Sequence, residues 1–249
     1  MIPLPSSLKV ISKKSNNLAT FEIEGLYPGY GVTIGNSLRR VLLSSIEGAA
    51  ITQVKIAGVQ HEFSTLPGVL EDVLHIILNL KKVRCKMYTS EPQKMELSVK
   101  GEGEVKAKDI KTPTQVEIVN PEAHIATLTS KNASLQMELL VERGLGYVPV
   151  EQRKKEKTPI GTIMLDAIFT PIQRVAFKVE NMRVGERTDY DRLFLEIETD
   201  GSITPEEALA QSASILVDQF ALIRDTFLPQ KEDKVTEEQK KDKTNKKKK

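Results

Sequence analysis

Asp189 and Asp191, which are separated by one residue, are the first candidates for chemistry in this sequence. Residues two apart on a strand share a face, so their carboxylates could together hold Mg²⁺ or Mn²⁺. No third carboxylate is clustered with them, and Arg187 and Arg192 flank the pair. The sequence therefore favours a surface ion-pair network, and an enzyme that uses the pair with a divalent metal is the rival hypothesis.

The chain has one cysteine and three histidines, so few residues are available for thiol or imidazole chemistry. Cys85 lies between Arg84 and Lys86, which could lower the pKa of its thiol, but no histidine is near in sequence to act as a base. A single cysteine also excludes an internal disulfide framework. His61 lacks the spacing of a metal-ligand pair, and His75, on an apolar stretch, is expected in a core or an interface.

A glycine-rich stretch, GYGVTIG over residues 29–35, precedes the first predicted helix. Its spacing is GxGxxxG rather than the dinucleotide-binding GxGxxG, and Asn36 follows where a P-loop requires lysine. We therefore interpret Gly29, Gly31 and Gly35 as residues that permit a tight turn and close packing. The sequence also has no GxSxG motif for a serine nucleophile.

The elements that position these residues are mixed. Alternating apolar and polar residues predict six strands, in the ranges 19–24, 51–57, 94–100, 134–142, 172–179 and 192–198. The apolar residues of the first and last of these fall on one face, which is typical of an antiparallel sheet with one wet side. Without regular strand–helix alternation, the expected fold class is α+β, not a doubly wound parallel sheet.

Three helices are predicted, over about residues 33–45, about 69–80, and from Thr204 to Leu228. The third begins with a capping box of Thr204 and Glu207 around Pro205. The second is apolar around most of its circumference, so we expect it to be buried on two sides, by another element or by a partner chain. The first has a core stripe and an opposite face that carries Asn36, Arg39, Arg40, Leu43 and Glu47.

The first and third helices have more apolar surface than one chain requires. In the third, a heptad-like seam consists of Leu209, Ala213, Leu216, Phe220, Ile223 and Phe227. This seam could pack on the chain's own sheet or on a partner, and a second apolar face at Ile215 and Leu222 favours self-association. On the first helix, a leucine flanked by two arginines suits a protein–protein contact, although a solvated face is the alternative.

Charge and composition exclude several classes of function. Residues 231–249 contain nine lysines and five acidic residues, whereas the whole chain of 249 residues has a net charge of +2. The remainder is therefore slightly acidic and has no electrostatic footprint for DNA. We expect residues 230–249 to be a disordered lysine-rich tail, which could make weak phosphate contacts. No signal peptide or membrane-spanning stretch is predicted, which favours a cytoplasmic location.

The stretch GYGVTIGNSLRRVLLSS at residues 29–45 closely resembles the first-helix signature of bacterial RNA polymerase α subunits. Further resemblances follow in the family's order at Val59–Thr65, Gly68–Val73, Glu142–Pro149, Val179–Asp189 and Glu198–Ala208. Together they run across about residues 5–228. The resemblance implies a dimerisation domain, formed by residues 1–48 and 174–229, into which a mainly β domain of residues 49–173 is inserted.

The resemblance also implies what the chain does: it is a non-catalytic subunit of a nucleotidyltransferase, and its homodimer scaffolds the assembly of the catalytic β and β′ subunits. Mg²⁺ is expected in those subunits, and no cofactor or catalytic residue is expected here. The implied dimer interface consists of Leu38, Leu42, Leu209, Leu216, Phe220, Ile223 and Phe227. The implied contact with the β subunit consists of Asn36, Arg39, Arg40, Leu43, His61 and Glu62, with residues 68–72 as further surface. The implied contact with β′ consists of Arg187, Thr188 and Asp189.

The family pattern and this sequence differ at the C-terminal end. Family members continue through a linker into a small helical domain that touches upstream DNA and activators, whereas this sequence ends in the lysine-rich tail. Either the chain is truncated, or the tail is native and supplies weak, sequence-independent attraction to DNA. A third functional hypothesis, besides polymerase scaffold and metal enzyme, is an adaptor dimer for another large protein.

Overall fold

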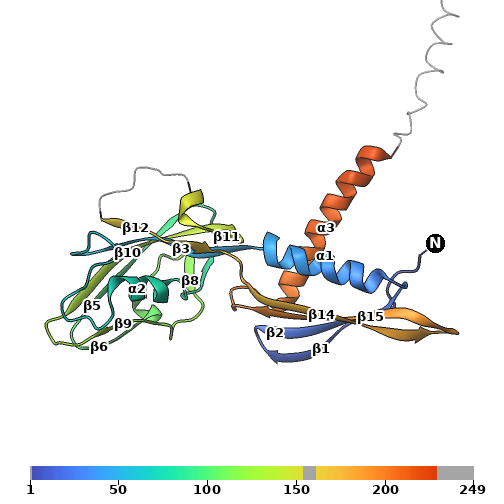
Figure 1. Ribbon diagram of the computed structural model, residues 1–249, viewed down its shortest axis with the longest axis horizontal. Coiled ribbons are helices and arrows are strands. Elements are labelled where there is room, and N and C mark those ends of the chain that lie inside the picture. Colours follow the sequence, from blue (N-terminus) through green and yellow to red (C-terminus); the bar gives the residue numbers. More distant parts are fainter. Residues whose placement is uncertain (1, 154–160, 229–249) are drawn as a thin grey trace, which may run out of the picture.

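The computed structural model describes residues 2–153 and 161–228. These residues form two bodies that lie next to each other along the long axis of the molecule (Figure 1). One body contains both ends of the described chain, and the other contains the middle of the sequence. The predicted lysine-rich tail at residues 230–249 lies outside the described residues.

The first body is built on a four-stranded antiparallel sheet with the order β1-β2-β15-β14. Its strands are β1 (Ser7–Ser15), β2 (Leu18–Leu26), β14 (Ile172–Val184) and β15 (Arg187–Thr199). Phe21 of β2 and Phe177 of β14 both pair with Leu195 of β15, so the three side chains form one row across the sheet. Strands from the two ends of the sequence thus share one core.

The two faces of this sheet differ in polarity, as the alternation in sequence predicts. Leu193, Leu195 and Ile197 of β15 are fully buried on the inner face. On the outer face, the guanidinium of Arg192 lies 3.1 Å from a carboxylate oxygen of Glu24. Other exposed ion pairs continue this ladder across the strands, joining Lys9 to Glu24 and Arg174 to Glu196 and Glu198. The outer face is therefore wet.

Two helices pack on the inner face, α1 (Tyr30–Ser45) and α3 (Pro205–Phe227). Helix α1 lies across β14 and β15, and α3 crosses α1 and extends beyond the body at its C-terminal half (Figure 1). Leu42 and Ala208, one from each helix, are fully buried in the same core cluster. At about 1.5–3 kcal/mol for each large buried side chain, this shared core holds both helices on the sheet.

The helix ends test the cap predictions. The predicted start of α3 is confirmed: Thr204 Oγ1 accepts a hydrogen bond from the Glu207 N–H at 3.2 Å, and Glu207 Oε2 accepts from the Thr204 N–H at 3.1 Å. Helix α1 begins at Tyr30, three residues before the predicted Thr33. The glycines of residues 29–35 therefore lie at its cap and in its first turns rather than in a loop before it.

The second body contains a seven-stranded sheet with the order β7-β5-β10-β3-β4-β8, in which β12 also pairs with β3, and two two-stranded sheets, β6–β9 and β11–β13. All pairings are antiparallel. The strands are β3 (Glu47–Ile56), β4 (Cys85–Met87), β5 (Gln93–Lys100), β6 (Gly103–Lys106), β7 (Ile110–Lys111), β8 (Val116–Ile118), β9 (His124–Leu128), β10 (Ser134–Leu145), β11 (Tyr147–Val148), β12 (Thr162–Met164) and β13 (Ala167–Ile168). Two short 3₁₀ helices cover Ala107–Asp109 and Val150–Gln152.

Helix α2 (Val73–Leu80) packs on this body and corrects two predictions. It begins at Val73, not Val69, because Asp72 caps it and Val69 bridges to Leu128 of β9. Within residues 2–153 and 161–228, one side of it is buried, whereas Leu74 and Leu78 are exposed. The expectation that another element of the chain buries a second side is therefore wrong, and a partner chain is the option that stays open.

The expected α+β class with antiparallel sheets is confirmed, and each of the six predicted strands corresponds to an observed one: β2, β3, β5, β10, β14 and β15. The division into residues 1–48 with 174–229, and 49–173, stays a prediction. No helix within the described ranges is long and apolar enough to cross a bilayer.

Candidate functional site

Asp191 joins the β14–β15 hairpin to the start of α1. It is 7% exposed, and its Oδ2 accepts hydrogen bonds from the Gly29 and Gly31 N–H groups, each at 2.9 Å. Amide groups in the first turn of a helix have no partner within the helix, and the helix dipole favours a negative charge there. Asp191 therefore caps α1 from strand β15, because Gly29, at the N-cap position, has no side chain to do so.

Asp189 takes part in a separate, exposed cluster. Arg187 donates to both of its carboxylate oxygens, at 3.0 and 2.7 Å, and the guanidinium carbon lies 5.3 Å from the Tyr190 ring centre and 5.7 Å from that of Tyr27. The Arg187 hydrogen bonds hold the pKa of Asp189 below its usual value. The Tyr27 and Tyr190 rings also contact each other edge to face, with centres 6.2 Å apart, so the arginine lies against a pair of rings. A bidentate pair supported in this way presents a defined arrangement of charge at the surface.

These contacts decide how the two aspartates are used. The Asp189 carboxylate faces an arginine at the surface and the Asp191 carboxylate is buried against two amide groups, so the pair does not form a shared metal-binding face. Across residues 2–153 and 161–228, His, Cys, Asp and Glu side chains form no group of three that could hold a metal ion. The favoured interpretation, a surface ion pair, holds for Asp189, whereas the capping role of Asp191 was missed.

Two glycines allow α1 to lie close to the sheet. A Cβ atom on Gly31 would lie 2.8 Å from Val179 Cγ1, and one on Gly35 would lie 2.8 Å from Phe177 Cδ2. These distances are shorter than any ordinary carbon–carbon contact, so only glycine fits. Gly29, at the cap, has a φ of 84°, which glycine adopts without strain. The interpretation of the glycine-rich stretch as turn and close packing is confirmed.

The outer face of α1 is open to solvent. Asn36, Arg39 and Arg40 are exposed, and Leu43 is half-buried at the edge of the core. Among the residues that the structure describes, neither arginine has an ion-pair partner. Unpaired guanidinium groups beside an apolar side chain are suited to a protein contact, because arginine anchors are enriched in interfaces.

The other residues with an implied β contact lie on the second body. His61 and Glu62 belong to the loop between β3 and α2, where His61 Nδ1 lies 3.2 Å from Ser64 Oγ. Phe63 and Leu70, in the same connection, are strongly exposed, and Leu74 adds an exposed side chain from α2. We call the surface formed by Phe63, Leu70 and Leu74 the apolar patch. The structure thus places these residues on a different body from Arg39 and Arg40.

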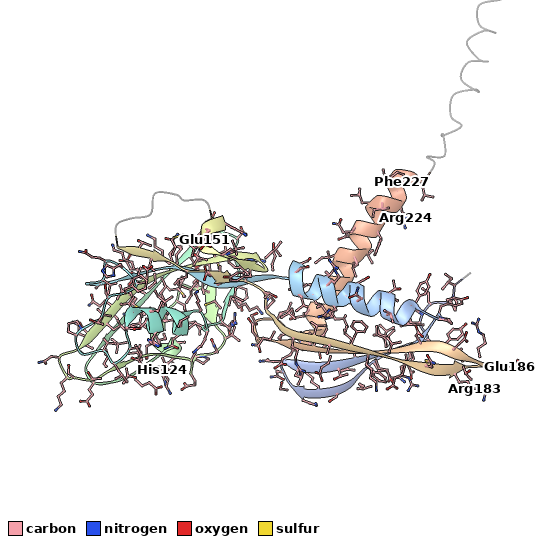
Figure 2. The ribbon with its side chains drawn as sticks, in the orientation of Figure 1. His124, Glu151, Arg183, Glu186, Arg224 and Phe227 are labelled. Atoms are coloured by element: carbon pink, nitrogen blue, oxygen red, sulfur yellow. The ribbon has the colours of Figure 1, made fainter. Side chains whose placement is uncertain are left out.

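The proposed dimer interface falls into two parts. Leu38 and Leu42 are buried in the chain's own core, and Leu209 and Leu216 are partly buried against it. Leu38 and Leu42 thus leave almost no surface for a partner. The outer half of α3 is exposed, with values of 61% for Phe220, 56% for Ile223 and 81% for Phe227. Figure 2 shows Phe227 at the projecting end of this helix, far from the rest of the body.

Two candidates from the sequence have other roles. Burial raises the pKa of the Cys85 thiol to about 12, which outweighs the lowering by the neighbouring Arg84, so the thiol is protonated and inert. His75 is exposed rather than in the core, and its Nδ1 lies 2.6 Å from Oδ1 of Asp72, the cap of α2. The core expectation for His75 is therefore wrong.

Some functional groups were missed at the sequence level. Tyr27 and Tyr190 flank Arg187, and Glu71 and His124 join the loop before α2 to strand β9. No sequence spacing indicates the Glu71–His124 pair or the Tyr27–Arg187 pair, because the partners in each are 53 residues or more apart. Tyr190 is only three residues from Arg187 and was overlooked. Only the position of Glu71 within a motif of the family resemblance pointed to its neighbourhood.

The fold and these surfaces define an α+β protein whose candidate functional groups lie on open, exposed faces. Residues 54–170 match the family described as the RNA polymerase Rpb3/RpoA insert domain. The chain is 49% identical over 242 residues to a DNA-directed RNA polymerase subunit alpha from Symbiobacterium thermophilum, covering 97% of this chain and 76% of that relative. It therefore belongs to the family of bacterial DNA-directed RNA polymerase α subunits.

Other relatives agree with this assignment. The subunit alpha of Geobacter metallireducens is 53% identical over 219 residues, 88% of this chain and 64% of the relative. That of Roseiflexus castenholzii is 54% identical over 211 residues, 85% of this chain and 65% of the relative. The chain thus spans slightly less than two thirds of the length of these two relatives.

Proposed function

We propose that this chain is a non-catalytic subunit of DNA-directed RNA polymerase, and that its homodimer is the platform on which the β and β′ subunits assemble. Membership of the α-subunit family carries this proposal. Nucleotidyl transfer, with its Mg²⁺, takes place in the large subunits. The chain itself contributes shape and surfaces rather than reacting groups.

The dimer forms through the exposed outer half of α3. Phe220, Ile223 and Phe227 follow one another at heptad spacing, and a helix with this seam in water is stabilised when a second copy covers it. Leu209 and Leu216, at the inner end of the seam, anchor the helix to its own body. The inner part of the seam therefore packs on the chain's own body, and the outer part packs on the second copy.

Two faces of the dimer take up the large subunits. The open face of α1, with Arg39, Arg40 and Leu43, meets β, and the apolar patch on the second body extends this contact. The hairpin end with Arg187, Thr188 and Asp189 meets β′. Arg187 is already held by its bidentate pair with Asp189, so it loses little side-chain entropy on binding, whereas the open guanidinium groups of Arg39 and Arg40 keep their donors available for a partner.

The experiment that tests this function is reconstitution of the tagged chain with purified β and then β′ subunits. We expect a dimer that binds β and then β′, analysed by size-exclusion chromatography with mass determination. Arg40→Ala should weaken β binding by about 30-fold, equivalent to about 2 kcal/mol, while the dimer persists. Arg174→Ala, an exposed arginine on the opposite face of the sheet, is the matched control and should bind normally.

The outcomes separate the functional hypotheses. A stable dimer that binds neither large subunit would overturn the scaffold function and favour an adaptor for another protein. Calorimetry that detects Mn²⁺ binding in the wild type and its loss in Asp189→Asn would favour the metal-enzyme hypothesis. Equal β binding by wild type and Arg40→Ala would remove the open face of α1 from the contact.

A further inference from the structure

The segment before α2 is attached to β9 like an additional strand. The Leu70 N–H donates to the Thr127 carbonyl oxygen at 2.9 Å, and the Thr129 N–H donates to the Gly68 carbonyl oxygen at 2.9 Å. Val69 forms a β-bridge with Leu128 between these bonds. The backbone of this segment therefore depends on β9 for its position.

The Glu71 side chain reinforces this attachment. Its Oε2 accepts from the Thr127 N–H at 2.6 Å, and its Oε1 accepts from Thr127 Oγ1 at 3.1 Å. The carboxylate is only 15% exposed. Burial by itself raises the pKa of the Glu71 carboxyl, but its hydrogen bonds with Thr127 and His124 more than offset this and hold the pKa below the usual value. Glu71 is therefore a charged group with defined partners rather than a solvated surface acid.

His124 lies between two carboxylates. Its Nε2 is 2.8 Å from Glu71 Oε1, and its Nδ1 is 3.0 Å from Glu104 Oε1. An ionised carboxylate only accepts hydrogen bonds, and a neutral imidazole has a single N–H. Both contacts can be hydrogen bonds only when the ring is the doubly protonated imidazolium. Loss of one proton therefore leaves one of the two carboxylates facing a lone pair.

The charges around the ring come from all of the packed elements. Glu71 lies in the segment before α2, and Glu104 and Lys106 lie on β6, the strand paired with β9. The Lys106 ammonium lies 3.4 Å from Glu104 and 3.0 Å from Glu122. Glu122 is therefore paired with lysine, and His124 is the basic side chain that Glu71 contacts. Figure 2 shows His124 on the β9 side of the second body, away from α3.

We infer that His124 and Glu71 are positioning residues that hold the segment of residues 68–72, and with it the apolar patch, in the shape that docks the β subunit, and that protonation of His124 strengthens this hold. The inference rests on the proposed function. Leu70, 71% exposed, lies directly before Glu71, so a shift of the Glu71 anchor moves this apolar side chain relative to Leu74, which α2 holds in place. The β subunit would meet a surface whose order depends on one ion pair.

The first test does not need a partner. Amide hydrogen exchange of the dimer should be at least about fivefold faster at Leu70 and Thr127 in Glu71→Gln and in His124→Gln than in the wild type. Glu122→Gln, the same substitution in the same charged cluster but without contact to Glu71, should exchange as the wild type does. We call the attachment of residues 68–72 to β9 through Glu71 and His124 the clamp. If amide exchange at Leu70 and Thr127 is as slow in both test variants as in the wild type, the clamp is refuted.

The second test uses the purified β subunit as the probe. Wild-type affinity should fall by at least about threefold when the pH is raised enough to leave the His124 ring with a single N–H. His124→Gln should bind weakly and with little pH dependence, and His124→Arg, which keeps a cation with several donors, should bind tightly across the range. A pH profile of His124→Gln parallel to that of the wild type would overturn the role of His124.

The two tests also separate this inference from the proposed function. If the wild type fails to bind β while exchange at Leu70 still depends on Glu71 and His124, the proposed function fails and the clamp stands as a local device only. If β binds the wild type and every variant equally, the scaffold function stands and the positioning role is refuted.

Discussion

Asp189 and Asp191 are two residues apart on one strand and nevertheless act in different ways. Asp189 is exposed and paired with Arg187, whereas Asp191 is buried and accepts from two amide groups of α1. The hydrogen bonds of Asp191 span 160 residues or more of sequence, so they tie the end of the chain's last hairpin to its first helix. The role of each carboxylate therefore depends on the groups that surround it, not on its position in the sequence.

Replacing Asp191 by alanine should destabilise the protein by about 1–3 kcal/mol, because the buried Gly31 N–H and the part-buried Gly29 N–H lose their acceptor. The measurement is urea unfolding followed by circular dichroism at one protein concentration. Asp189→Ala is the matched control and should leave the unfolding midpoint nearly unchanged, since surface ion pairs contribute little. Equal losses in the two variants would contradict the capping role.

Asp166 connects α2 to the segment before β13. A hydrogen bond from Lys81 Nζ at 2.8 Å, together with the Val150 N–H, holds the pKa of Asp166 below its usual value. A lowered pKa contributes stability that is present above about pH 4 and is lost as the pH falls through the folded-state value. Asp166→Asn should therefore flatten this acid limb of the stability profile.

The measurement is the urea unfolding midpoint between about pH 5 and about pH 2.5. Lys81→Met removes the other partner of the ion pair and should flatten the same limb. An acid limb in Asp166→Asn as steep as that of the wild type would show that other carboxylates carry it.

At the scale of elements, α1 and α3 have opposite requirements. Helix α1 is pressed so close to β14 and β15 that Gly31 and Gly35 have no room for a side chain. Helix α3 leaves the body after its first turns, and its outer half carries exposed phenylalanines (Figure 1). The first helix is thus covered by its own sheet, whereas the outer half of the third is exposed to solvent in the described chain.

Phe220→Asp should convert the proposed dimer into monomers, because each copy would bury a carboxylate in an apolar seam. Light scattering should then give the monomer mass at concentrations where the wild type is dimeric. Gln211→Asp adds the same charge to an exposed position on the opposite side of α3 and should stay dimeric. A dimer mass for Phe220→Asp would exclude the seam as the interface.

At the scale of the whole molecule, the candidate contacts are widely separated. The β14–β15 turn, with Arg183 and Glu186, lies at one end of the long axis, and His124 lies in the other body (Figure 2). A chain with surfaces spread in this way can contact large partners at several points. Such a shape suits a scaffold better than an enzyme, whose reacting groups converge in one pocket.

Arg187→Ala should block the addition of β′ to the complex of the dimer with β, while leaving dimerisation and β binding intact. The reason is that Asp189, Tyr27 and Tyr190 lose the cation that organises this surface. Native mass spectrometry of the assembly measures it. Arg183→Ala, in the same hairpin but without these contacts, is the control, and normal addition of β′ to Arg187→Ala would reject the site.

Much of the fold was predictable because its signals are local. The capping box at Thr204 and Glu207, and the alternation in β2 and β15, each depend on residues within a few positions of one another. Strand β1 was missed because most of its residues are exposed on both faces, which removes the alternation that marks a strand. The start of α2 was misplaced because an apolar run reads alike as helix or as bridged strand.

The features of the candidate site also divide into those that the sequence indicates and those that only the folded structure shows. By itself the sequence determined the α+β class, the antiparallel strands, the seam of α3 and, through resemblance, the family. Only the tertiary structure decided that Asp191 caps α1, that the inner end of the α3 seam packs on the chain's own body, and that Glu71 contacts His124. Those contacts join residues far apart in the chain, and their energies depend on burial and on facing charges, which exist only after the two bodies have folded.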